Sequence, residues 1–530
     1  MNNRTSKAWQ QYEAGKAYKR RIGLYETVRR NEAFYRGDQW QSGEGEGLPK
    51  PVFNVIKRVI DFLVCSVASS DLTIRFTDEN LPFADEKQRK LSNALIETLN
   101  QNTEYRWESC GMDSMIHKLL TDAAISGDGA LYCYWDSEKR GAGGYMGDIV
   151  TDMIDASCIF PADVNRADIQ SQDYVILSGR STVFSLRNEA RASGVPENEV
   201  MRIVRDDESA YRSGDMAKYE LEGEDEEKAT FIVKFWREDG KVCFEKSTKE
   251  CVIRRARTDC TLYPIAYFSW VGAKNSFHGV SPVTCLIPNQ RFVNRAYAMA
   301  MKHMTDTAFS KVIYDKSKIP EWSNEVGEAI AAMGGGNISD AVSVIGVGQM
   351  QSGFTEIVDS AVSLTKELMG ATESALGNLE ANNTSAILAL QETSRITLDN
   401  IRYAFYGCIE ELADVWADMI AAYYPADRLL PCQTADGVTC KTIDTSDIRN
   451  AYISARIDVN EISRYGAINA QNMLDKLLDG GFISAAEYVK RLPAGLIGDR
   501  QALVDALEQG KGVHTEYGDV CGDSSVGYGE

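Results

Sequence analysis

The longest segment with regularly spaced apolar residues lies between residues 385 and 424. Apolar side chains such as Ile401, Phe405, Leu412 and Trp416 recur there every three or four positions, which is the spacing of one face of an α-helix. A helix over these residues would be about 60 Å long at 1.5 Å per residue. Because this exceeds the width of a compact domain, we expect it to cross a large assembly or to brace several layers.

Five further segments have helical spacing or helix-end signals. Asn54 and Ser281 are residues that cap helix N-termini, and Pro282 suits a first helical position, whereas Pro288 should kink or restart its helix. The first segment should stop at Gly37. The predicted helices cover residues 7–36, 55–67, 112–125, 281–308 and 354–376.

The remaining ordered segments are typical of β-strands. Residues 130–135, which follow a glycine turn at 127–129, have the composition of a strand. Residues 452–457 have the same strand-like composition. The runs 230–236 and 242–244 are joined through Asp239-Gly240, which is a strong hairpin signal. The sequence therefore predicts an α+β fold that is mainly α.

Composition narrows the class of protein. The 530 residues suggest roughly three or four domains of about 150 residues. With 57 basic and 77 acidic residues the net charge is −20, which argues against tight non-specific DNA binding through a broad basic face. The acidic residues 222–227 close a polar linker, and residues 508–530 should be disordered.

The chain has the features expected of a cytosolic protein. Residues 1–30 contain no apolar signal region, and the apolar stretch 59–67 is far shorter than the ~20 residues of a membrane span. The twelve cysteines form no C-x-x-C pair and the four histidines are scattered, so we expect reduced thiols and neither a bound metal nor a cofactor.

Enzyme motifs are weak. The phosphate-binding G-x4-G-K-[ST] pattern is absent, the glycines at 346, 348 and 353 have the wrong spacing for a dinucleotide loop, and Ser281 lacks the closing glycine of a nucleophile elbow. We therefore expect no catalytic residues. The many carboxylates leave a metal-dependent nuclease or hydrolase open as an alternative.

Several segments, taken together, resemble the portal (head-to-tail connector) proteins of tailed double-stranded DNA bacteriophages. No single segment is diagnostic, but their order agrees with the family over residues 20–507. They are NEAFYRGDQW (31–40), KPVFNVIK (50–57), AISGDG (124–129), YPIAYFSW (263–270), FHGVSP (277–282), IPNQRFVN (287–294), NTS (383–385) and LQETS (390–394).

The resemblance implies a non-enzymatic subunit of a ring, usually of twelve copies, at one capsid vertex of the virion, with DNA passing through its axis. The implied partners are double-stranded DNA, the terminase large subunit, head-completion adaptors and a capsid or scaffolding protein. The chain would be made in the bacterial host cytoplasm and would have no membrane partner. Another phage ring or capsid component is the alternative within this class.

The order of elements assigns portal domains to the chain by this resemblance. The expected parts are an N-terminal wing (1–181), a possible first stem helix (182–206), the clip (207–276), a stem helix (277–308), wing and a helix leading to the tunnel loop (309–376), the tunnel loop (377–384), the long wing helix with returning strands (385–463), the crown (464–507) and a disordered tail (508–530).

Two groups of residues are candidates for DNA contact. Arg291, Arg295 and Lys302 fall within roughly 40° of one another on their helix, and in a ring they would form bands of positive charge; the alternative is that they pair with Glu or Asp on a neighbouring subunit or face solvent. The second group lies in a small, polar loop that is either the tunnel loop or an ordinary turn, with asparagines for phosphates and one apolar side chain: Gly377, Asn378, Leu379, Asn382, Asn383 and Thr384.

Overall fold

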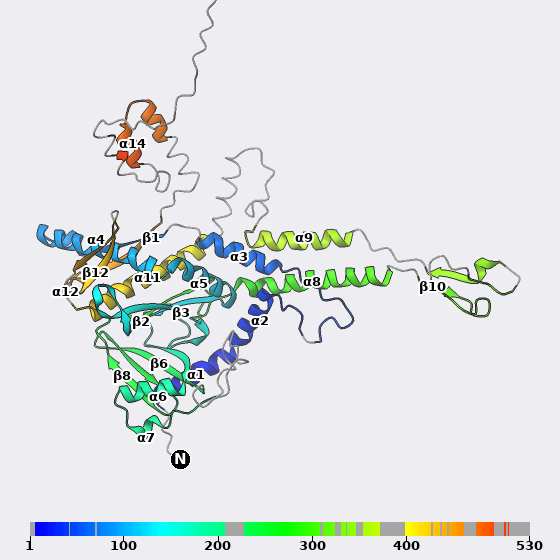
Figure 1. Ribbon diagram of the computed structural model, residues 1–530, viewed down its shortest axis with the longest axis horizontal. Helices are drawn as coiled ribbons and strands as arrows, with labels where there is room; N and C mark the ends of the chain where they lie inside the picture. The colour runs from blue at the N-terminus through cyan, green and yellow to red at the C-terminus, as the bar shows by residue number, and fades with distance from the viewer. Residues whose placement is uncertain are drawn as a thin grey trace, which may run out of the picture. The chain divides into compact units, whose positions relative to one another are not determined.

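The computed structural model describes residues 6–41, 43–68, 72–206, 227–307, 311–323, 330–334, 337–345, 353–371, 398–425, 428–434, 437–442, 445–459, 473–491, 503–504 and 507. The chain divides into two compact units (Figure 1). The first contains residues 1–379 and 393–459, and the second contains residues 380–392 and 460–530.

The N-terminal segment forms two helices, α1 (Lys7–Arg21) and α2 (Leu24–Arg36), where one was expected. The break falls at Gly23, whose φ of 68° is a left-handed conformation that interrupts a helix. The end of α2 at Gly37 and the start of α3 (Val55–Ala68) agree with the prediction. Asn54 caps α3 by accepting a hydrogen bond from the Lys57 amide (3.0 Å).

The core of the first unit is built around a three-stranded antiparallel sheet in the order β3-β2-β9. Its strands are β2 (Asp128–Arg140), β3 (Met146–Ile154) and β9 (Ile265–Ser269). One face contacts α5 (Met112–Ser126) and α11 (Asp399–Tyr423), where Phe268 packs against Phe405. The other face contacts a second sheet through Tyr132 and Phe235, so the sheet is the middle of three layers (Figure 1).

The second sheet has five antiparallel strands in chain order, and its central hairpin turns at Asp239 and Gly240, both with positive φ, as the sequence predicted. Helices α6 (Val183–Ala192) and α7 (Glu197–Val200) precede β6, and α6 packs against β5 and β8. The strands are β4 (Ile159–Pro161), β5 (Tyr174–Thr182), β6 (Lys228–Glu238), β7 (Lys241–Ser247) and β8 (Val252–Arg257).

This part of the chain corrects one expectation. Residues 182–206 do not form one stem helix, because Gly194 (φ 79°) and Pro196 separate two short helices. Within the segment 207–276, which was expected to form the clip, β6 pairs with β5 along its length and β9 pairs with β2. Strand pairing across the proposed boundary at residue 206 therefore joins this segment to the N-terminal part of the chain.

Two helices pack against each other later in the chain. Helix α8 (Pro282–Thr307) continues through Pro288 and ends close to the predicted residue 308. Its neighbour α9 (Gly353–Leu368) ends eight residues before the predicted residue 376. Between them in sequence, β10 (Lys311–Tyr314) and β11 (Val342–Ile345) form a two-stranded antiparallel sheet.

The remaining elements of the first unit lie around α11. Helix α4 (Glu86–Ser109) contacts β1 and β12, and β14 confirms the strand expected at 452–457. Of the 40-residue helix expected from 385, residues 385–397 lie outside the described residues, and α11 itself is about 37 Å long. The other bounds are β1 (Leu72–Asp78), β12 (Leu429–Thr434), β13 (Gly437–Thr442), α12 (Thr445–Asn450) and β14 (Ile453–Val459).

In the second unit, residues 473–479 and α14 (Ala485–Arg491) are helical, within the segment expected to form the crown. The tunnel-loop candidates at 377–384 and the tail at 508–530 lie outside the described residues. Over the described parts of the chain, no helix combines the length and apolarity needed to cross a membrane. The described cysteines are free thiols.

Candidate nucleic-acid interface

The start of α8 is fixed by a buried polar cluster. Asp128, at the beginning of β2, is 2% exposed and accepts hydrogen bonds from the Gly279 amide (2.7 Å) and the Ser269 hydroxyl (3.1 Å). His278 Nδ1 lies 2.7 Å from the same carboxylate, and burial lowers the pKa of this histidine. A single carboxylate therefore holds the loop that leads into α8.

Two glycines allow this loop to approach β2. A Cβ atom at Gly127 would lie 2.8 Å from the Gly279 carbonyl oxygen, and one at Gly279 would lie 2.7 Å from the Gly127 oxygen. Ser281 then begins the helix, donating to the Ala124 carbonyl (2.7 Å) and accepting from the Val283 amide (3.1 Å). The predicted capping role of Ser281 is confirmed.

The N-terminal half of α8 is also tied to α2 and α3 by buried amides. Gln290 accepts a hydrogen bond from the Val55 amide (3.0 Å) and donates to Asn294 (2.9 Å). Asn294 donates in turn to Gln39 (2.7 Å). These bonds leave the C-terminal half of α8 as the part that extends beyond the anchored region.

The three cations of the predicted basic stripe all lie on α8, but each has a partner within the chain. The guanidinium of Arg291 lies over the Phe34 ring (5.4 Å). Arg295 is 60% exposed and pairs with Glu44 (3.3 Å), and Lys302 pairs with Asp306 (3.2 Å). Arg295 and Lys302 thus already pair with carboxylates of their own chain, and the contact of all three cations with DNA stays a prediction.

The opposite side of α8 packs against α9 (Figure 1). Val293 and Ala296 contact Val358, and Asn289 donates to Thr365 (3.1 Å), so the two helices run antiparallel. At 100° per residue, one flank of this pair presents large exposed apolar side chains from both helices. We call this flank the α8–α9 apolar face; its residues are Phe292, Met299, Ile357, Leu364 and Leu368.

The sequence analysis did not identify this face. The positions at 357, 364 and 368 have helical spacing, and such a pattern is equally typical of a helix buried inside one subunit. Only the exposure of the side chains distinguishes a helix with an open apolar face from a helix buried inside one subunit.

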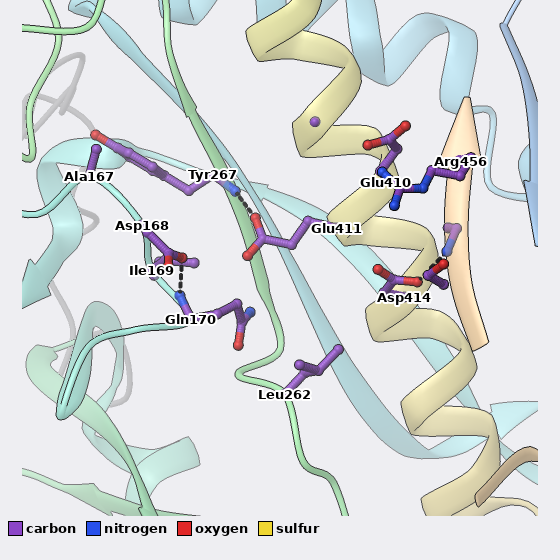
Figure 2. Close-up of a pocket in the computed structure, with 13 residues that line it drawn as sticks. Ala167, Asp168, Ile169, Gln170, Leu262, Tyr267, Glu410, Glu411, Asp414 and Arg456 are labelled. Atoms are coloured by element: carbon purple, nitrogen blue, oxygen red, sulfur yellow. Dashed lines mark hydrogen bonds between the residues drawn. The ribbon is translucent and has the colours of Figure 1, made fainter. Parts of the chain in front are cut away.

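A cavity of about 380 Å³ lies beside α11 (Figure 2). The carboxylates that line it are Asp168, Glu410, Glu411 and Asp414. Glu411 points to the Tyr267 amide at the free edge of β9 (3.1 Å), and Asp414 accepts from the Ala455 amide of β14 (2.7 Å). Glu410 accepts from the Ile457 amide (2.9 Å), and Asp418 from the Leu262 amide (2.9 Å). The acidic face of α11 therefore occupies backbone donors along two strand edges.

Burial changes the pKa of two of these carboxylates, Glu411 and Asp414. It raises the pKa of Glu411 to about 7 and that of Asp414 to about 6, although backbone hydrogen bonds act in the opposite direction. No cluster of three or more histidine, cysteine or acidic side chains with metal-binding geometry occurs among the described residues.

A family model for the phage P22-like portal protein matches residues 194–464, about half of the chain. The chain belongs to the P22-like portal protein family. This membership implies a homo-oligomeric ring associated with the phage capsid and DNA, and the family is structural rather than enzymatic. The match includes α8, α9 and α11.

Among the solved structures that this chain resembles is one from a phage-like neck assembly. A chain from the neck of an empty GTA particle, computed with C6 symmetry, is 13% identical with a TM-score of 0.36. The alignment covers 83% of this chain and 90% of that chain. No curated protein matches the sequence.

Proposed function

We propose that this portal-family chain forms a ring at one capsid vertex through which double-stranded DNA is packaged and ejected. The ring would also dock the terminase large subunit and the head-completion proteins, and twelve copies remain the expected number. The observation that carries the proposal is the family match over residues 194–464.

The packing of the chain supports a different placement of stem and clip from the one expected. A stem requires two helices that pack together on either side of an inserted segment, and α8 and α9 meet this requirement. We place the stem at these helices and the clip at residues 308–352, which contain the β10–β11 hairpin. Residues 182–276 then belong to the wing, because their strands share sheets with β2 and β5.

The α8–α9 apolar face supports contact between copies of the chain. Leu364 and Leu368 are 53% and 75% exposed, and Phe292 and Met299 extend the same surface on α8. A contiguous apolar surface on a soluble protein marks an interaction site. In a ring, the matching partner is the neighbouring subunit, whose contacting surface would cover these side chains.

The ring is tested by imaging and native mass measurement of the purified protein. We expect closed rings with a central channel for the unaltered chain and for Ser363→Glu, a control about 100° around α9 from Leu364. Leu364→Glu should shift the population toward free subunits by about tenfold or more, because it places a charge in an apolar contact.

Three possible failures are distinguishable. A chain that remains a single subunit at every concentration, also with capsid proteins present, refutes the ring. Normal rings from Leu364→Glu refute only the role of the apolar face, and rings without a channel favour another phage ring component.

A further inference from the structure

A second, smaller cavity lies in the first unit, among α4, β2, β3 and the start of β12. Its volume is about 160 Å³. Four cationic side chains line it, Arg106, Lys139, Arg140 and Arg428, together with a single carboxylate, Asp148. The charge of the lining side chains is thus positive in a chain whose net charge is −20.

The two arginines are deep in the protein. The side chains of Arg106 and Arg428 are 8% and 3% exposed, and each lies 3.7 Å from the same Asp148 oxygen. That oxygen already accepts hydrogen bonds from the Tyr424 hydroxyl and the Ile149 amide (2.8 Å). Among the residues that the structure describes, this one carboxylate is the acidic group that lines the cavity, and it can offset only one of the two buried charges; an unbalanced charge is costly at low dielectric.

The hydrogen-bonding capacity of the guanidinium groups is only partly used. Arg106 donates to the Tyr424 hydroxyl (2.8 Å), and its Nε has no partner among the described residues. Arg428 donates to the Gly147 carbonyl (2.8 Å) and stacks on the Tyr424 ring (3.8 Å). Arg106 also donates to the Ile149 carbonyl (3.4 Å). The protein therefore holds both guanidinium groups in place, and the Nε of Arg106 is left with unused donor capacity among the described residues.

The cations at the mouth of the cavity come from an irregular part of β2. The register of β2 against β3 shifts between Asp136 and Arg140, and such irregularities redirect side chains at the end of a strand. Lys139 and Arg140 are exposed, so they can close over a group that enters the cavity.

We propose that this cavity binds a small free oxyanion of the phosphate class. Arginine forks and an ammonium group are the donors that bind phosphate oxygens in proteins. The volume accommodates one such group, and the depth of Arg106 and Arg428 favours an ion that enters the cavity over the backbone of a duplex that passes along the surface.

The test uses inorganic phosphate with the full-length protein at constant ionic strength. We expect phosphate, but not chloride, to raise the melting temperature and to bind measurably in calorimetry. Lys139→Gln/Arg140→Gln should weaken binding by about tenfold or more, the loss expected for charge-assisted hydrogen bonds. The charge-matched control is Lys249→Gln/Lys274→Gln, two exposed positions that do not line the cavity.

Three results overturn the proposal. The first is no effect of phosphate on the unaltered protein, and the second is an equal loss in both double variants. The third is displacement of phosphate by a duplex DNA oligonucleotide that no longer binds to the Lys139→Gln/Arg140→Gln variant, because the occupant of the cavity is then a DNA backbone.

Discussion

Replacing Glu411 with glutamine should change how the stability of the protein depends on pH. The carboxylate lies in the cavity beside α11, near Asp168, Asp414 and Gln170, and accepts a hydrogen bond from the Tyr267 amide. Glutamine keeps an oxygen that can accept this bond and removes the charge. The variant therefore isolates the effect of ionisation.

The magnitude follows from the change in pKa between the two states. Burial raises the pKa of Glu411 from 4.5 to about 7, so the folded chain holds its proton at pH values where the unfolded chain has released it. The contribution of Glu411 to the free energy of unfolding is therefore greatest below pH 4.5 and is lost as the pH rises through 7. A shift of this size corresponds to about 3 kcal/mol in the free energy of unfolding.

The assay is urea unfolding followed by tryptophan fluorescence between pH 4.5 and 8, with both proteins in the same oligomeric state. We expect Glu411→Gln to gain about 3 kcal/mol relative to the unaltered protein across this range. Glu250→Gln, at an exposed position, controls for the change in net charge. A stability difference that is constant with pH, or that changes in the opposite direction, refutes the reasoning.

Two further changes test the anchoring of α8 and its charge. Asp128→Ala removes the buried acceptor of Gly279, Ser269 and His278 and should cost about 3 kcal/mol in urea unfolding, with Asp128→Asn losing less; equal stability of all three proteins would contradict this. Arg295→Glu/Lys302→Glu should leave rings intact but reduce nuclease-protected DNA per particle by on the order of tenfold. Normal DNA content would remove these residues from the channel.

Local signals in the sequence were sufficient for many elements. The caps at Asn54 and Ser281 and the turn at Asp239-Gly240 act over a few residues, and the structure confirms each of them. The break at Gly23 was missed because a single glycine inside a helical pattern is often tolerated.

Long-range pairing could not be predicted in the same way. The pairing of β6 with β5 joins segments separated by a linker, and neither strand's sequence identifies the strand with which it pairs. The oxyanion cavity combines Arg106, Arg140 and Arg428 from three distant parts of the sequence. Of the DNA-contact candidates, the helix of Arg291, Arg295 and Lys302 was predicted correctly, whereas their carboxylate partners required the fold.

The carboxylates of α11 have a consequence for the chain before it joins an assembly. A strand at the border of a sheet offers unpaired amides to which a strand of another molecule can add, and this is a route to aggregation. At β9 and β14 the amides of Tyr267, Ala455 and Ile457 are already occupied by Glu411, Asp414 and Glu410. Helix α11 thus blocks these strand edges against pairing with strands of other subunits. Association can then proceed through the surfaces that form the intended subunit interfaces.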